Sequence, residues 1–300
     1  MTLYYVGIDG GGTSCRARIR DELGTLIGEA NSGSANILLG TQLAMNSIHT
    51  AISNAAKQGN LTENDYKNMH VGLALAGAEQ RSAWNELMSI PHPFASVTLN
   101  TDAYGACIGA HAGKNGAIMI SGTGSCGIYL KNHKQHVVGG REFPISDLGS
   151  GAMMGLDLIQ QTLLAYDEIH PHTELSQHVF HYFEQDVDNV VTWSKTAKPK
   201  DYAQFAPLIF ELADKGDELA VALLKKTAND IEMYLMALNR KGANKIALMG
   251  GIAQRIENWL SPHVQQWIVK PQFDAIEGAI MFAGKPVHNL YTAEDSKALR

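Results

Sequence analysis

Near the start of the chain an apolar stretch runs into an aspartate and three successive glycines, Val6-Gly7-Ile8-Asp9-Gly10-Gly11-Gly12-Thr13. The apolar part belongs to a strand predicted over residues 3–9, which the glycines interrupt. Beyond them Cys15, Ala17 and Ile19 alternate with arginines, the period of two that is typical of a half-buried strand. The pattern therefore predicts a β-hairpin whose turn is made of glycine.

The next residues are predicted to continue as an antiparallel meander. Residues 21–24 are typical of a turn and residues 25–30 of a third strand. A Rossmann domain would instead pass from its glycine-rich turn into a helix. A helix predicted over residues 41–58 and apolar strands over 71–76 and 97–100 complete an α/β lobe.

The same order of elements restarts near residue 116. Strands are predicted over residues 117–121, 126–131 and 136–138, and Gly122-Thr123-Gly124 forms the turn after the first of them. A second β-meander that begins beside a glycine turn suggests an internal duplication.

Two lobes are expected, because a chain of 300 residues is longer than a typical single domain. The repeat places the N-terminal lobe at residues 1–116 and the C-terminal lobe at residues 117–300. Residues 166–204, which hold four of the twelve histidines, are predicted to be variable connecting structure. Helices of the second lobe are expected over residues 152–165, 217–240 and 275–284.

Composition limits what the protein binds. The formal net charge is −6 and no long run of Lys or Arg is present, which argues against nucleic acid and anionic membrane surfaces as partners. No stretch of about 18 apolar residues suggests a membrane span. The cysteines Cys15, Cys107 and Cys126 show no CxxC spacing, which fits a reducing compartment. A cytoplasmic protein that binds small molecules is expected, and whether it forms a homodimer is left open.

The first glycine turn is a candidate phosphate site. Without Cβ atoms, Gly10, Gly11 and Gly12 would let backbone N–H groups surround an anion, and Thr13 adds a hydroxyl donor. For this segment alone, a glycine-rich turn without a ligand is an equal alternative. Asp9 favours the phosphate interpretation, because an acid beside a phosphate loop is expected chiefly where Mg²⁺ lies between them.

A second glycine-rich segment matches the spacing GxGxxG of dinucleotide-binding loops, Gly122-Thr123-Gly124-Ser125-Cys126-Gly127. We reject that interpretation, because the following residues continue as a strand where a Rossmann turn would open a helix. A Walker A loop is absent as well, since Gly113-Lys114 lacks the preceding glycine at the required spacing. The segment is therefore predicted to be a second glycine hairpin, placed to face the first across a cleft.

Two aspartates follow predicted strands and have two interpretations each. Asp102 lies between the strand at 97–100 and a helix of small residues, where it would either cap the helix or accept the proton of a sugar hydroxyl. Asp147, in Ser146-Asp147-Leu148-Gly149, has the same ambiguity, and a carboxylate there would hold sugar hydroxyls by charge-assisted hydrogen bonds.

The histidines His170, His172, His178 and His181 fit no established zinc spacing. Their segment also carries many acidic and polar residues. A solvated surface is therefore expected there rather than a metal site.

Four motifs in order resemble those of the actin-like ATPase superfamily of sugar kinases and chaperone ATPases: Ile8-Asp9-Gly10-Gly11-Gly12-Thr13, Asn100-Thr101-Asp102-Ala103, Ser121-Gly122-Thr123-Gly124-Ser125 and Leu248-Met249-Gly250-Gly251-Ile252. Within the superfamily, the chain resembles the BadF/BadG/BcrA/BcrD ATPase family, which includes amino-sugar kinases. The resemblance covers nearly the whole chain. It implies an α/β fold of two ribonuclease H-like lobes, the second with a helical insertion, that close on ATP and sugar in an interlobe cleft.

The resemblance also implies roles for individual residues. Asp9 would organise Mg²⁺, and Asn36 and Asp147 match positions that contact the sugar. Asp102 matches the catalytic acid/base, which also binds the sugar. The residues expected to bind ATP are Gly10, Gly11, Gly12, Thr13, Thr123 and Gly124 at the phosphates and Gly250 and Gly251 at the adenosine.

One departure from the resemblance bears on the sugar. Ala76 stands where the eukaryotic N-acetylglucosamine kinases carry a serine, so a polar contact near the sugar is lost. This favours free glucosamine as the substrate. The predicted activity is ATP-dependent phosphorylation of its 6-hydroxyl, with Asp102 as base, and N-acetylglucosamine phosphorylation is the alternative.

Two other functions are known for proteins of similar fold. A dehydratase-activating ATPase would need paired cysteines to hold an iron–sulfur cluster at a subunit interface, which Cys15, Cys107 and Cys126 do not suggest. A non-catalytic sugar sensor is disfavoured because Asp9 and Asp102 are both retained. Both functions are kept as weaker alternatives to the kinase.

Overall fold

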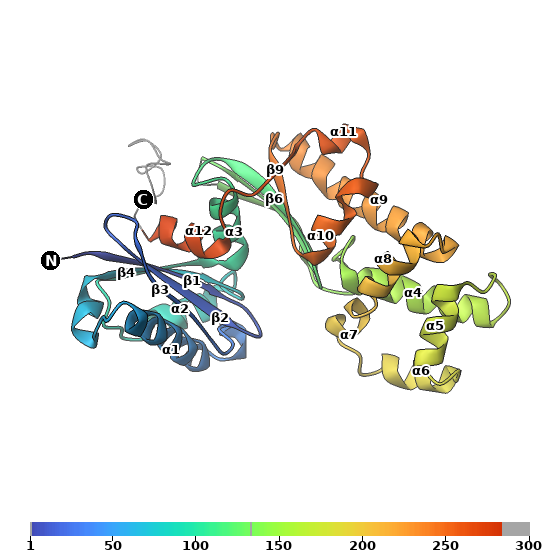
Figure 1. The fold of residues 1–300 in the computed structure, drawn as a ribbon, viewed down its shortest axis with the longest axis horizontal. Coiled ribbons are helices and arrows are strands. Elements are labelled where there is room, and N and C mark those ends of the chain that lie inside the picture. Colours follow the sequence, from blue (N-terminus) through green and yellow to red (C-terminus); the bar gives the residue numbers. More distant parts are fainter. Residues whose placement is uncertain (1, 133, 284–300) are drawn as a thin grey trace. The chain divides into compact units, whose positions relative to one another are not determined.

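The computed structural model describes residues 2–132 and 134–283, which fall into two compact units (Figure 1). Of the described residues, the first unit holds those up to Gly116, those of the segment 130–135 and those from Lys270 to residue 283. The second holds the segments Ala117–Tyr129 and His136–Val269. Among the described residues, no helix has both the length and the apolar character needed to cross a bilayer.

The first unit is built on one mixed sheet. Its strands lie in the order β3-β2-β1-β4-β5, with β1, β2 and β3 antiparallel and β1, β4 and β5 parallel. The elements are β1 (Tyr4–Gly10), β2 (Cys15–Asp21), β3 (Leu26–Ser32), η1 (Ile37–Leu39), α1 (Thr41–Gln58), η2 (Glu63–Asn68), β4 (Met69–Leu75), α2 (Arg81–Ser89), β5 (Ser96–Thr101), α3 (Asp102–Ala110) and α12 (Ala275–Phe282).

The two faces of this sheet pack against different helices. Val6 and Ile8 are buried in one cluster with the apolar residues of α1. Gly7 points the other way, because side chains alternate along a strand, and a Cβ there would lie 2.2 Å from the carbonyl oxygen of Ile276 in α12. Glycine in β1 thus lets the backbone of α12 approach the sheet closely.

Helix α12 belongs to the first unit, although the sequence-based division placed residues 117–300 in the second lobe. The red helix α12 lies beside α3 in Figure 1. Gly109 of α3 makes this contact close, since a Cβ there would lie 2.1 Å from the Asp274 carbonyl oxygen. The division differs because side-chain patterns near residue 275 predict a helix without indicating the sheet on which it packs. Residues 284–300 of the predicted lobe lie outside the described part.

The second unit repeats the strand order of the first. Its sheet runs β10-β9-β6-β7-β8, so the first strand of the set is again central, and β6, β9 and β10 are parallel. The elements assigned mainly to this unit are β6 (Gly116–Ser121), β7 (Ser125–Lys131), β8 (Lys134–Gly139), α4 (Gly151–Tyr166), α5 (Glu174–Tyr182), α6 (Val187–Ser194), α7 (Pro199–Ala203), α8 (Ala206–Asp214), α9 (Glu218–Arg240), β9 (Ile246–Met249), α10 (Gly251–Ile256), η3 (Glu257–Trp259), α11 (Pro262–Gln265) and β10 (Ile268–Val269). The α/β class is confirmed, and the repeated order agrees with an internal duplication.

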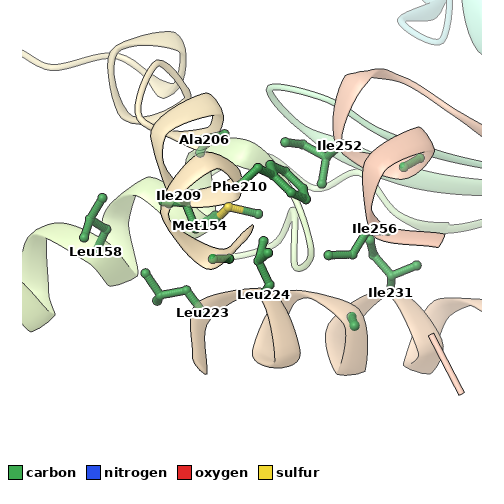
Figure 2. Packing of buried hydrophobic residues seen from close by; sticks show 14 of the residues in the cluster. Met154, Leu158, Ala206, Ile209, Phe210, Leu223, Leu224, Ile231, Ile252 and Ile256 are labelled. Carbon is green, nitrogen blue, oxygen red and sulfur yellow. The ribbon is translucent and has the colours of Figure 1, made fainter. Parts of the chain in front are cut away.

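The helices of the second unit share one apolar core. Figure 2 shows side chains from α4, α8, α9 and α10 meeting there, among them Leu158, Ile209, Leu224 and Ile256, all of which are buried. Several such residues come from segments far apart in sequence. The core therefore fixes where the loops that end β6 and β9 lie relative to α8.

The segment predicted as variable connection is instead largely helical. Helix α5 begins with a capping box in which Thr173 and Ser176 satisfy each other's backbone N–H groups, and Asp186 caps α6. Val179 and Val190 are buried in the core of the second unit. These helices are short and their apolar residues few, which is why the sequence pattern alone did not indicate them.

Candidate functional site

The first glycine turn lies where β1 ends. Gly10 closes β1, and the Gly11 N–H donates to the carbonyl oxygen of Ser14 at 2.9 Å, which shapes the turn into β2. The Gly11 carbonyl oxygen in turn accepts a hydrogen bond from the Ala35 N–H at 3.0 Å. The predicted hairpin is therefore present, and the loop before η1 is hydrogen-bonded to it.

The three glycines of this turn differ in how closely other atoms surround them. A Cβ on Gly10 would lie 2.7 Å from the Cβ of Ala35, so packing requires glycine there. A Cβ on Gly11 or Gly12 would meet no atom within 4 Å, and neither residue has a positive φ. Since the fold does not require glycine at Gly11 and Gly12, close approach of a ligand to the backbone is the remaining physical reason.

Asp9, the candidate Mg²⁺ residue, forms an ion pair across the hairpin. The Arg16 guanidinium donates to its carboxylate at 2.5 Å, and the two residues are register partners on β1 and β2. Among the described residues, no group of three or more His, Cys, Asp or Glu side chains could hold a metal. A Mg²⁺ ion that is bound mainly by nucleotide phosphates and water needs only one carboxylate, so Asp9 fits that kind of site.

Asp102 lies at the carboxyl edge of the same sheet. Gly10 of β1 is the register partner of Leu75 of β4, and Leu75 is the register partner of Thr101 of β5. The three parallel strands therefore end at the same edge of the sheet. Asp102 follows β5 directly and is the first residue of α3. The sheet therefore brings the first glycine turn and Asp102 to one edge, where ligands of parallel sheets bind.

The interpretation of Asp102 as a helix cap is wrong. The Thr101 hydroxyl caps α3 by accepting from the Tyr104 N–H at 3.1 Å. The Asp102 carboxylate accepts a hydrogen bond from the neighbouring Ala103 N–H at 2.8 Å. Burial raises the pKa of this carboxyl above its usual value, and the charges of Asp9 and Glu79 raise it further, against the lowering effect of the Ala103 N–H. Asp102 is thus a carboxylate with increased proton affinity.

Asn36 is placed in the first unit beside the loop that follows β4. Its side chain accepts a hydrogen bond from the Leu38 N–H at 2.9 Å and so caps η1. The Ile37 N–H donates to the Ala76 carbonyl oxygen at 3.1 Å, and Gly77 is so close that a Cβ there would lie 2.9 Å from the Asn36 Oδ1. Because the Ala76 N–H donates to Gly10, this loop also contacts the end of β1.

The second glycine hairpin connects β6 and β7 in the second unit. The Gly122 N–H donates to Gly124, and the Gly122 and Thr123 carbonyl oxygens accept from the N–H groups of Gly151 and Ala152 at 2.7 and 3.1 Å. A Cβ on Gly122 would meet no atom within 4 Å, as at Gly11 and Gly12. The two hairpins therefore share the same feature, a glycine that packing does not require.

Asp147 lies against this second hairpin. It is 8% exposed, it has φ of 60°, and its carboxylate would be 2.9 Å from a Cβ on Gly124. Burial raises the pKa of this carboxyl, partly offset by a hydrogen bond from the Ser125 N–H. Within the first unit Asn36 lies beside the loop after β4 and Asp102 at the sheet edge, whereas Asp147 belongs to the second unit.

Gly250 and Gly251 lie where β9 meets α10. Gly250 has φ of 93°, and a Cβ there would lie 2.4 Å from the Ser121 carbonyl oxygen, so both conformation and packing require glycine. A Cβ on Gly251 would meet no atom within 4 Å. Gly250 thus keeps the loop after β9 close to the second hairpin.

A cavity of about 530 Å³ opens beside this loop in the second unit. Its lining joins the second hairpin to helices α7, α8 and α10: Gly122, Thr123, Gly151, Ala203, Ala206, Pro207, Phe210, Gly251, Ile252 and Arg255. The sequence analysis did not select Phe210 or Arg255. No local signal marks them, because α8 is an apolar helix and α10 a short one, and only packing brings them together.

Comparison with known proteins identifies relatives of the chain. The model of the BadF/BadG/BcrA/BcrD ATPase family matches residues 6–283. The chain is 68% identical over 288 residues to the glucosamine kinase GspK of Vibrio cholerae serotype O1, covering 96% of this chain and 98% of that protein. It is 28% identical over 258 residues to the N-acetyl-D-glucosamine kinase of Dictyostelium discoideum, covering 79% of each.

A solved structure shows the same fold. The crystal structure of a candidate N-acetylglucosamine kinase from Chromobacterium violaceum superposes with a TM-score of 0.85 at 32% identity, covering 94% of this chain and 99% of that one. The predicted fold class, two ribonuclease H-like lobes of the actin-like ATPase type, is confirmed.

Proposed function

The chain belongs to the BadF/BadG/BcrA/BcrD ATPase family, and from that membership we propose that it is an ATP-dependent kinase of free glucosamine, which it converts to glucosamine 6-phosphate. The observation that carries the proposal is the 68% identity to a glucosamine kinase over nearly the full length of both chains. The placement of Asp102 at the sheet edge next to a glycine turn supports it independently.

ATP is the phosphate donor of the proposed reaction. In the first unit Gly10, Gly11, Gly12 and Thr13 are proposed to contact its phosphates, and in the second unit Thr123 and Gly124. Gly250 and Gly251 are proposed to contact the adenosine, which the cavity beside them is large enough to hold. Asp9 would hold Mg²⁺, which supplies positive charge at the phosphates.

Asp102 is proposed to act as the base. Its carboxylate takes the proton of the 6-hydroxyl as that oxygen attacks the γ-phosphorus in line, and ADP leaves with the electrons of the broken P–O bond. A raised pKa increases the proton affinity of the carboxylate. Asn36 and Asp147 are proposed to bind sugar hydroxyls, and Asp102 also orients the sugar.

Free glucosamine is proposed over N-acetylglucosamine for two reasons. The relative with 68% identity is a glucosamine kinase, whereas the N-acetyl-D-glucosamine kinase has 28% identity. Ala76 also offers no side-chain hydrogen bond beside Asn36, where a serine would. We further propose a cytoplasmic location, which agrees with a sequence of only three cysteines that show no CxxC spacing.

A sugar panel tests the function. Purified protein with ATP and Mg²⁺ is given glucosamine, N-acetylglucosamine, glucose or no sugar, and ADP release and sugar phosphate are both measured. We expect kcat/KM for glucosamine to exceed that for N-acetylglucosamine by at least tenfold. A higher kcat/KM for N-acetylglucosamine than for glucosamine would contradict the proposed substrate.

The same panel separates the alternatives. A dehydratase-activating ATPase would release ADP without sugar, and a sensor would show no turnover. Two of the three cysteines, Cys15 and Cys107, are buried, which disfavours the activator because a shared cluster needs accessible thiolates.

A further inference from the structure

The cavity of the second unit offers almost no polar side chains to a bound nucleotide. Of its ten lining residues only Thr123 and Arg255 have side chains with polar groups, and none of the ten is an acid or an amide. Recognition of a base by its hydrogen-bonding edge usually relies on a few placed polar groups in an apolar pocket. Polar side chains are nearly absent from this lining, so apart from backbone groups a base would be held mainly through its faces.

Arg255, one of the two polar side chains of this cavity, contacts an aromatic ring. Its guanidinium carbon lies 4.2 Å from the centre of the Phe210 ring, a cation–π contact. Phe210 is 4% exposed and points from α8 toward Ile252 of α10, as Figure 2 shows, so it is a rigid support. Among the described residues, Arg255 makes no ion pair or side-chain hydrogen bond, and it is exposed, so its guanidinium is accessible to a ligand.

A planar guanidinium supported by an aromatic ring is a stacking surface for a nucleobase. Arginine planes and aromatic rings both stack on bases, and such stacking is tolerant of base identity because every base has a π-face. The larger two-ring purines gain more contact area than one-ring pyrimidines. The remaining lining, from Ala203, Pro207 and Ile252, is apolar and suits the flat faces and edges of a ring.

We propose that Arg255, held on Phe210, is the residue that selects the nucleotide, and that it does so by stacking on the purine face, so that the enzyme uses purine nucleoside triphosphates regardless of the substituents at C6 and C2 of the base. This inference rests on the proposed function for the location of ATP. It adds that ATP, ITP and GTP are all phosphate donors, whereas UTP and CTP are poor ones.

The first experiment compares donors. With saturating glucosamine, kcat/KM is measured for ATP, ITP, GTP and UTP. We expect ITP and GTP to lie within tenfold of ATP, and UTP to be more than tenfold lower. A GTP value more than tenfold below that of ATP would mean that the base edge is recognised, and would overturn the inference.

The second experiment separates stacking from charge. Arg255→Lys keeps the positive charge but loses the plane, and Arg240→Lys, at the exposed end of α9 and away from the cavity, is the matched control. Binding of fluorescent ribose-labelled ATP, GTP and UTP is measured without sugar. We expect Kd for ATP and GTP to rise on the order of tenfold in Arg255→Lys and Kd for UTP to change less than threefold.

Two outcomes would contradict the role of Arg255. An unchanged Kd for the purine nucleotides would show that the guanidinium plane is not used. An equal loss for ATP and UTP would show that Arg255 acts on the phosphates instead. Nucleotide binding is measured without sugar, so the result does not depend on whether glucosamine is the substrate. A wrong substrate and a wrong role for Arg255 can therefore be told apart.

Discussion

Among single residues, Asp102 combines a position at the edge of the first sheet with a largely buried carboxylate. It follows β5 at the edge where three parallel strands end, and Thr101 rather than Asp102 caps α3. Burial and the charges of Asp9 and Glu79 raise its pKa. Ionisation of a partly desolvated carboxyl lowers the stability of the folded protein, and for the same reason the carboxylate has a higher proton affinity.

Replacing this carboxylate separates catalysis from stability. We expect Asp102→Asn to lower kcat by about 10²–10⁴-fold, the usual contribution of a general base, with little change in binding of labelled ATP. Asparagine can still accept the Ala103 N–H, so the fold is kept. Turnover near that of the unchanged enzyme would remove Asp102 from the mechanism.

The same variant has a pH-dependent effect on stability. The pKa of Asp102 is raised in the folded state, so ionisation at neutral pH opposes folding, and Asp102→Asn is expected to raise Tm at pH 7 by roughly 1–3 °C. The gain should disappear as pH falls through the folded-state pKa to below the ordinary aspartate pKa, where both states are protonated. Asp214→Asn, at the exposed end of α8, is the control and should show neither effect.

Among the elements, the two glycine hairpins show how a turn can serve both packing and binding. In the first hairpin Gly10 is enclosed by Leu75 and Ala35, whereas Gly11 and Gly12 meet nothing. In the second, Gly124 contacts the carboxylate of Asp147, whereas Gly122 meets nothing. Each hairpin therefore pairs a glycine required by the fold with one left open to a ligand.

This difference predicts opposite results for neighbouring substitutions. Gly10→Ala should lower the free energy of unfolding by about 1–3 kcal/mol, because its methyl group overlaps the Cβ of Ala35. Gly11→Ala should leave Tm unchanged within about 1 °C and lower kcat/KM for ATP by at least tenfold, since the methyl group occupies space proposed for a phosphate. Chemical denaturation and steady-state kinetics check the pair. Equal kinetic and stability losses in both variants would argue that Gly11 is structural.

On the scale of the whole molecule, an ion-pair network joins β2 to α12, two elements of the first unit that lie far apart in the sequence. Arg18 of β2 contacts Glu29, Asp274 and Glu277, and Arg20 contacts Glu277 as well. Glu277 is 3% exposed, and its Oε2 has no hydrogen-bond partner among the described residues. The network therefore holds α12 on the first sheet by charges that are largely removed from water.

Breaking this network should destabilise the first unit. Glu277→Gln leaves the charge of Arg20 without its carboxylate partner, and loss of one partner from a buried pair typically costs about 3–5 kcal/mol of unfolding free energy. Glu29→Gln is the matched control, because Glu29 is 39% exposed and its loss should cost about 1 kcal/mol or less. Denaturant titration compares the two variants. If they are equally stable, the buried pair does not hold α12 in place.

Residues that act through their neighbours in the chain were predictable. The alternation around Ile19, the glycine turns and the helix over residues 41–58 all follow from spacing of side chains along one segment. The motifs around Asp9 and Asp102 were sufficient for the resemblance to the family that the comparison found. Such patterns depend on local conformation, which the order of residues specifies directly.

Contacts between distant segments were decided only by packing. Local pattern left open whether Asp102 caps α3 or accepts a proton, assigned α12 to the other lobe, and gave no reason to select Arg255 and Phe210. Each of these depends on which surfaces meet when a sheet and its helices exclude water together. Which surfaces meet depends on the whole core. The glycine turns could therefore be predicted from the sequence, whereas Arg255, which lies beside one of them, could not.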